Sequence, residues 1–209
     1  ALSAATLGIM AINAQRETFR DEDYIRVHPI ITKGGDLVNI VPADVRLETY
    51  VRGRNVEAVM AANEKVNRAL KSGAMAVGAD VIITEVPGYL PLENEPTLTE
   101  LFRANMAELI GSENILAGQH MAGSTDMGDV THLMPAIHPS CGGVRGRAHT
   151  REFQIVDPEM AYIVPAKAMA MTAIDLLAED ARLARQILIG FKSRLTREEY
   201  LELWDRLLG

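Results

Sequence analysis

The sequence predicts an α+β protein, and three observations support this prediction. Residues 44–53 alternate between apolar and polar side chains, as in a half-buried antiparallel strand. A long amphipathic helix follows, and Asn55 is suited to cap its first turn. Helical patterns return near the C-terminus, after Asp157 and after Thr196. A sheet and several helices are therefore expected in one chain.

The first predicted elements are a helix and a strand. Residues 2–19 are apolar with small side chains, which indicates a helix that buries Leu7, Met10, Ile12 and Ala14. A turn at 21–24 leads into a strand at 26–32, where Pro29 restricts the strand to a sheet edge or a bulge. After a turn at 33–36, the strand at 44–53 turns one face inward, formed by Val45, Leu47, Thr49 and Val51. Its other face holds Tyr50 and three charged residues, and we interpret Arg46 and Glu48 there as solvated.

The helix after Asn55 has an apolar stripe that we interpret as core: Val56, Val59, Met60, Asn63, Val66, Leu70, Ala74 and Val77. A strand is expected at 79–86, and Thr97 with Glu100 predicts a capping box for a helix that ends near Ile110. Residues 22–110 can thus form a small sandwich in which helices cover one face of an antiparallel sheet.

The remaining residues have a different composition. A short strand is expected at 114–118, a polar loop at 123–139, and a strand with a glycine turn at 136–146. Asp157 and Pro158 open a helix whose apolar residues are Met160, Ile163, Ala168, Met171, Ile174 and Leu177. Thr196 and Glu199 form a second capping box, for a terminal helix with Leu201, Leu203, Trp204 and Leu207.

Composition narrows the classes of function. The net charge is -7 with scattered basic residues, so we expect no nucleic-acid surface. No apolar run approaches the ~20 residues of a membrane span, so no membrane association is expected. Cys141 is the only cysteine, which fits a reducing, cytoplasmic location. The chain begins at Ala1 inside an apolar helix, and we expect it to be a piece of a longer protein.

Four segments carry a resemblance to a known family: 26–53, with the sequence RVHPIITKGGDLVNIVPADVRLETYVRG; 123–139, with GSTDMGDVTHLMPAIHP; 148–153, with AHTREF; and 161–177, with AYIVPAKAMAMTAIDLL. In this order and spacing they resemble the second half of aminoacylase-type or carboxypeptidase-type dinuclear metallohydrolases of peptidase family M-twenty. The greatest similarity is to the amidohydrolase subfamily that includes aminobenzoyl-glutamate hydrolase.

The resemblance implies a fold and its domains. Such enzymes have a catalytic domain interrupted by a ferredoxin-like lid, an antiparallel sheet with two helices on one face, which usually mediates dimerisation. Residues 22–110 would be the lid, and residues 1–21 and 111–209 would be part of the catalytic domain. We therefore expect a homodimer that forms through the lid.

The resemblance also implies two bridged divalent ions, usually zinc and in some members manganese, which activate a water molecule. His149 matches the last metal ligand of the family; the pattern alone reads as a surface histidine between Arg147 and Arg151. The family's other ligands lie in a His-x-Cys-Gly-His motif and a Glu-Glu pair of the first half. This chain has neither, because its one Glu-Glu pair, Glu198–Glu199, lies in the terminal helix. The site is therefore incomplete in this chain.

The lid residues match the family at three positions. His28 matches a histidine that reaches across the dimer to stabilise the oxyanion; the alternative is a strand histidine packed against its neighbours. Asn39 matches a residue that helps to hold the oxyanion or the substrate backbone. Arg52 matches the arginine that binds the substrate carboxylate, and the alternative is a solvated strand end.

The loop at 123–139 matches a substrate-side loop of the family. Gly123, Ser124 and Thr125 would donate hydrogen bonds near the carboxylate end of the substrate. We expect the carboxylates of Asp126 and Asp129 to hold the loop by hydrogen bonds, and expect structural roles for His132 and His138.

Two functions follow for the chain. The first is a fragment of a metal-dependent amidohydrolase or peptidase that hydrolyses an amide bond next to a free carboxylate, such as an N-acyl amino acid or an aminoacyl-glutamate. Alone, this fragment is expected to be inactive. The alternative is a non-catalytic dimerisation or binding module built on the lid sheet.

Overall fold

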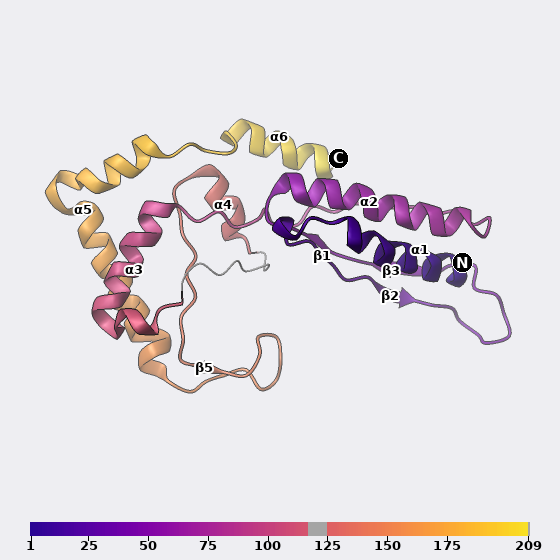
Figure 1. Ribbon diagram of the computed structural model, residues 1–209, viewed down its shortest axis with the longest axis horizontal. Helices are drawn as coiled ribbons and strands as arrows, with labels where there is room; N and C mark the ends of the chain where they lie inside the picture. Colours follow the sequence, from indigo (N-terminus) through magenta and orange to yellow (C-terminus); the bar gives the residue numbers. More distant parts are fainter. Residues whose placement is uncertain (117–124, 209) are drawn as a thin grey trace. The chain divides into compact units, whose positions relative to one another are not determined.

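The computed structural model describes residues 1–116 and 125–208 and shows a mixed α+β chain, in which helices predominate over short strands (Figure 1). These residues divide into two compact units. Unit 1 holds Ala1–Pro91 together with the end of the chain from Trp204, and unit 2 holds residues 92–116 and Thr125–Leu203. The lid and catalytic-domain boundaries stay a prediction, because compact units do not show which residues form a catalytic domain.

Unit 1 is built on two helices that lie side by side, α1 (Leu2–Gln15) and α2 (Val56–Met75), as Figure 1 shows. Short 3₁₀ turns follow α1 at Arg16–Thr18 and Asp21–Asp23. The predicted cap of α2 is confirmed, since the Asn55 side chain accepts a hydrogen bond from the Ala58 N–H at 2.9 Å.

The strands of unit 1 form one interrupted antiparallel hairpin. β1 (Arg26–Val27) pairs with β4 (Val51–Arg52), and β2 (Ile30–Lys33) pairs with β3 (Arg46–Glu48). The register does not change across the break, because Val27 lies opposite Val51 and Ile30 lies opposite Glu48. Pro29 lies at the break and has no N–H to donate, which explains why the ladder is interrupted there.

The alternation predicted for residues 45–52 is confirmed. Val45, Leu47, Thr49 and Val51 are half-buried, whereas Arg46, Glu48, Tyr50 and Arg52 are exposed. Val27 is fully buried in a cluster with Ile12, Ala62 and Val66, and Val51 packs against it. One face of the hairpin therefore lies on the helices and the other is open to solvent.

Small side chains form most of the contact between α1 and α2, and the predicted stripes are confirmed only in part, at Ile12, Val66 and Ala74. In α1 the buried residues are Ala4, Gly8 and Ile12, and in α2 they are Ala58, Ala62, Val66, Ala69, Gly73 and Ala74. Of the expected core, Leu7, Met10 and Ala14 in α1, Met60 in α2 and Val77 after it are exposed instead. The reason is the short distance between the helices: a Cβ added to Gly73 would lie 2.7 Å from the Ala4 carbonyl oxygen.

The prediction of a strand at 79–86 is wrong. These residues form no ladder, and Ile82 and Val86 are 93% and 78% exposed. Their one long-range polar link is made by Glu85, whose carboxylate accepts hydrogen bonds from the side-chain amides of Asn63 and Asn67 on α2.

Unit 2 begins with α3 (Pro96–Ile110), which packs on α5 (Val164–Gly190), as in Figure 1. Their shared core consists of Phe102, Met106, Val164 and Ala168. The expected capping box of Thr97 and Glu100 is wrong: Glu95 caps α3 by accepting from the Leu98 N–H at 2.5 Å, and Glu100 pairs with Arg103 instead.

The other elements of unit 2 agree only in part with expectation. The residues of the expected strand at 114–118 that are described form no strand, and a 3₁₀ turn occupies Ser112–Asn114. The expected loop at 123–139 contains a helix, α4 (Met127–Leu133). A strand and glycine turn were correctly expected, since β5 (Val144–Arg145) pairs with β6 (Gln154–Ile155) and Gly143 has φ +84°.

Helix α5 begins with a π turn at Glu159–Ile163, where Asp157 accepts a hydrogen bond from the Met160 N–H. Its core residues are Val164, Ala168, Thr172 and Ile187, whereas the expected Ile163, Ile174 and Leu177 are exposed. The helix is broken at Ala178–Ala181, where Glu179, Asp180 and Ala181 have left-handed φ of 51–58°. Helix α6 (Arg197–Leu208) follows.

Among the described residues, Glu159–Gly190 is the one segment that passes a test of length and apolar composition for a membrane span. Such a single helix is weak evidence, and the break at 178–181 weakens it further.

Candidate functional site

His28 and Arg52 lie on the same face of the unit 1 hairpin. The register on either side of the break places His28 opposite Tyr50, and Arg52 is two residues from Tyr50 on the same strand. Residues opposite each other in an antiparallel pair share a face, as do residues two apart on one strand. All three are exposed, so this is the face that does not touch the helices.

The Arg52 guanidinium lies over the ring of Tyr50, 5.2 Å from its centroid. Such a stack restricts the side chain while leaving the N–H groups at the edge of the guanidinium available to an anion. Arg52 is thus stacked on Tyr50 at the hairpin surface, on the same face as His28, and its role in binding a carboxylate stays a prediction.

Asn39 lies apart from this pair in the connection between β2 and β3. It is exposed in a turn in which the Ile40 N–H donates to the Leu37 carbonyl oxygen at 3.3 Å. No contact of the described residues joins Asn39 to His28 or Arg52. Its predicted role is neither supported nor contradicted by its position.

Thr125 begins the turn that enters α4. Its hydroxyl donates to the Asp126 carboxylate at 2.9 Å, and its carbonyl oxygen accepts from the Gly128 N–H at 2.8 Å. Gly123 and Ser124 lie outside the described residues. Asp129 is buried in α4 and accepts a hydrogen bond from the Tyr200 hydroxyl at 3.3 Å, so this bond joins α4 to a distant segment and is not a bond within the loop.

His149 lies in the turn between β5 and β6. It is exposed and has a left-handed backbone with φ +66°, which is uncommon for a residue other than glycine. The part of the chain that the structure describes contains no group of three His, Cys, Asp or Glu side chains that could hold a metal ion. His149 alone can offer one imidazole donor, which does not hold an ion.

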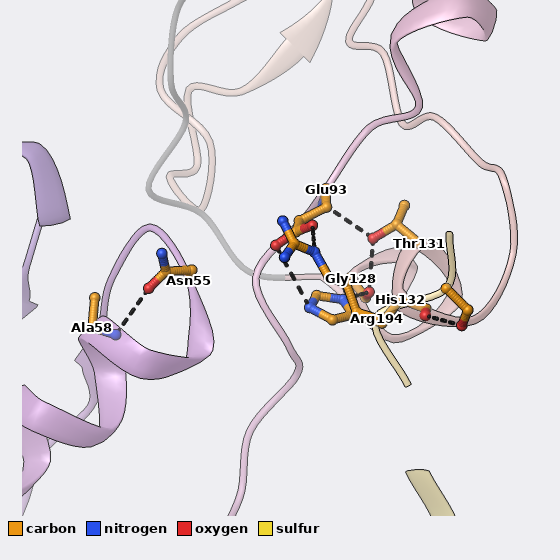
Figure 2. Close-up of polar contacts among 8 residues, drawn as sticks. Asn55, Ala58, Glu93, Gly128, Thr131, His132 and Arg194 are labelled. Carbon is orange, nitrogen blue, oxygen red and sulfur yellow. Dashed lines mark hydrogen bonds and ion pairs between the residues drawn. The ribbon is translucent and has the colours of Figure 1, made fainter. Parts of the chain in front are cut away.

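A polar network around two buried residues of unit 2, Thr131 and His132, was not predicted from the sequence (Figure 2). Its centre is His132 on α4, which is 3% exposed. Nδ1 of His132 lies 2.8 Å from the Gly128 carbonyl oxygen, and because a carbonyl only accepts, Nδ1 carries the proton. The expectation of a structural role for His132 agrees with this geometry.

Glu93 and Arg194 complete this network. The Glu93 carboxylate accepts a hydrogen bond from Nε of Arg194 at 2.8 Å, and it lies 4.0 Å from Nε2 of His132, which is too far for a hydrogen bond. The backbone N–H of Glu93 donates to the Thr131 hydroxyl at 3.1 Å, and Ser193 donates to the His132 carbonyl oxygen at 2.8 Å. These bonds fix α4 to the segments before α3 and before α6.

Cys141 is the chain's one candidate for thiol chemistry. Partial burial raises the pKa of its thiol above the ordinary value of 9.0. The thiol is therefore protonated at neutral pH, which makes it a poor nucleophile.

The chain is similar in sequence to proteins named as dipeptidases and as a hydrolase. No protein-family model matches the chain. It is 30% identical over 211 residues to the Xaa-Arg dipeptidase of Mus musculus, covering 96% of this chain and 48% of that protein. It is 29% identical over 218 residues to the human Xaa-Arg dipeptidase, covering 96% and 47%.

A third relative is the uncharacterized hydrolase y4tI of Sinorhizobium fredii, 26% identical over 188 residues and covering 84% of this chain and 45% of that protein. The chain thus spans about half the length of the curated relatives it matches. Together these similarities support a peptidase or hydrolase family.

Proposed function

We propose that the chain supplies the substrate-contacting part of a hydrolase that cleaves an amide bond next to a free carboxylate. The observation that carries this proposal is the position of His28 and Arg52 on one exposed face of the hairpin. The similarity to dipeptidases agrees with it, because a dipeptide has an amide bond next to a C-terminal carboxylate.

Arg52 is proposed to bind that carboxylate. A guanidinium can form two parallel hydrogen bonds with a carboxylate, which a lysine cannot. The stack on Tyr50 supports this role, since it limits the number of conformations that Arg52 loses on binding.

His28 is proposed to stabilise the negative charge that develops on the carbonyl oxygen during hydrolysis. An imidazole N–H is a suitable donor, and its exposure leaves it free to meet a substrate held by another subunit. The lid, residues 22–110 with a ferredoxin-like arrangement, is proposed to form a homodimer in which His28 acts on the partner's substrate. Asn39 would assist at the oxyanion or the substrate backbone.

Gly123, Ser124 and Thr125 are proposed to contact the substrate near its carboxylate. Residues 1–21 and 111–209 would belong to the catalytic domain, in a cytoplasmic enzyme. The finer assignment, to the amidohydrolase subfamily of aminobenzoyl-glutamate hydrolase within peptidase family M-twenty, is also part of the proposal.

A pair of divalent ions, zinc or manganese, is proposed for the complete enzyme, where it would polarise the scissile carbonyl. The described residues do not fit such a pair, because only His149 is matched as a ligand and no three-ligand group accompanies it. No step of the reaction is therefore assigned to these residues through a metal.

This same finding favours a second function, a non-catalytic binding or dimerisation module. The two are separated by assaying hydrolysis of N-acyl amino acids and dipeptides with the complete protein and with the 209-residue chain. Chelator-sensitive hydrolysis by the complete protein alone supports the hydrolase. If neither the complete protein nor the 209-residue chain hydrolyses these substrates and both still dimerise, the binding module is supported.

A further inference from the structure

Arg26 and Arg52 lie directly opposite each other across β1 and β4. Both are exposed, and because opposite residues share a face, both belong to the hairpin face that carries His28. The Cα atoms of such a pair are about 4.5–5.5 Å apart, so the two guanidinium groups can reach one ligand together.

Neither arginine has a carboxylate partner among the described residues. Arg26 donates from Nη1 to the carbonyl oxygen of Ile25 at 3.0 Å, and Arg52 stacks on Tyr50. Two other arginines nearby do have carboxylate partners: Arg46 pairs with Asp44, and Arg20 pairs with Glu22. The Arg26–Arg52 pair is thus an unneutralised cationic site.

Like charges directly opposite each other destabilise a sheet. An anion that bridges both guanidinium groups would remove this repulsion and form charge-assisted hydrogen bonds with each. The hairpin therefore gains stability on binding an anion, and a ligand with two acidic groups can engage both arginines at once.

We propose that Arg26 and Arg52 together bind the two carboxylates of an acidic amino acid, so that Arg26 determines the specificity of the site. This inference rests on the proposed function, in which Arg52 binds the carboxylate next to the scissile amide. Arg26 then meets a second carboxylate, that of an aspartate or glutamate side chain. A cationic side chain at the same place would be repelled.

The test compares the affinities of the 209-residue chain for N-acetyl-glutamate and N-acetyl-glutamine, measured by isothermal titration calorimetry at low salt. The two ligands have nearly the same shape and differ by one carboxylate. The chain should bind N-acetyl-glutamate about tenfold more tightly, as one additional charge-assisted contact provides. Arg26→Gln should remove this preference while leaving N-acetyl-glutamine binding in place. N-acetyl-arginine should bind more weakly than either.

Arg46→Gln is the matched control, because it removes the same charge from the same hairpin but from an arginine already paired with Asp44. It should keep the preference, and circular dichroism should confirm that each variant is folded. The inference is overturned if the two ligands bind equally, if neither binds, or if Arg46→Gln acts as Arg26→Gln does. Hydrolysis by the complete protein without a preference for acidic substrates overturns this inference alone. Preferential binding without any hydrolysis overturns the proposed function alone.

Discussion

Glu93 accepts a hydrogen bond from Nε of Arg194 at 2.8 Å, although 101 residues separate them in the chain. The backbone of Glu93 is bound in turn to Thr131 on α4, whose hydroxyl also donates to the Gly128 carbonyl oxygen at 2.8 Å. Three separate segments of unit 2 are therefore joined by a few polar groups.

The first prediction concerns Thr131, which is 2% exposed. Thr131→Val keeps the shape but removes the acceptor of the Glu93 N–H, so the free energy of unfolding should fall by about 1–3 kcal/mol. Urea unfolding followed by circular dichroism measures this. Thr99→Val, which removes an exposed hydroxyl on α3, should change it by less than about 0.5 kcal/mol. Equal effects of the two substitutions would contradict the role given to the network.

The second prediction concerns the contact between α1 and α2. Gly→Ala usually stabilises a helix by up to about 1 kcal/mol. Gly73→Ala should do the opposite, lowering the free energy of unfolding by about 1–3 kcal/mol, because its Cβ would lie 2.7 Å from Gly8 Cα. Gly190→Ala, where nothing lies within 4 Å of the added Cβ, is the control and should not destabilise. Thermal melts of both variants decide the matter.

The third prediction concerns the pH dependence of α6. The backbone N–H and the side chain of Thr196 hold the pKa of the Glu199 carboxyl below its ordinary value of 4.5. The ionised form therefore stabilises the start of α6 above that pH, and this contribution is lost as pH falls through the lowered pKa. Thr196→Ala should raise the pKa of Glu199 in an NMR titration. It should remain below 4.5, because the backbone hydrogen bond persists. An unchanged pKa would exclude the side-chain contribution.

Some of the features behind these predictions can be predicted from the sequence and others cannot. The cap at Asn55 and the capping box of Thr196 and Glu199 were predicted correctly, because each depends on neighbours within three residues. The helical stripes were predicted only in part: Ile12, Val66 and Ala74 are buried as expected, whereas Met10 and Met60, expected in the core because of their size, are exposed. The two helices approach so closely that only small residues fit between them, and this is a property of the pair.

For the candidate site, too, the sequence predicts the local features and not the contacts between distant segments. Period-two alternation placed Arg52 on the exposed side of its strand, and the register then brought His28 to that side. The association of Glu93 with His132 and Arg194 could not be predicted, because contacts between distant segments leave no local pattern. Thr97 and Glu100 fit the sequence pattern of a capping box but do not form one. Helix α3 begins two residues earlier, after Glu95, and the Glu95 side chain caps it.

The fourth prediction separates the proposed roles of Arg52 and His28 in the complete protein. Arg52→Lys should mainly raise KM, because a carboxylate is bound in the ground state and the transition state alike. His28→Ala should lower kcat by about 10²–10³, since the charge it stabilises appears only in the transition state. Steady-state kinetics on an N-acyl amino acid, and on its amide as control, would show each effect. A fall in kcat for Arg52→Lys with unchanged KM contradicts its assignment.

The fifth prediction tests action across a dimer. A His28→Ala subunit mixed with a His149→Ala subunit should recover activity, because the mixed dimer holds one site with an intact His149 and the partner's His28. Random exchange places about half of the dimers in this class. Native mass spectrometry verifies the exchange. Mixed dimers without activity would show that His28 does not act on the partner's substrate.

The break in α5 has a consequence for how the chain can be cut. Glu179, Asp180 and Ala181 are non-helical, exposed or half-buried, and followed by Arg182 and Arg185, so trypsin should cleave there before it cleaves the intact helices. The released piece would keep Ser193 and Arg194, which bind His132 and Glu93. The two fragments would then stay bound to each other after cleavage, and unit 2 would remain folded although its chain is cut.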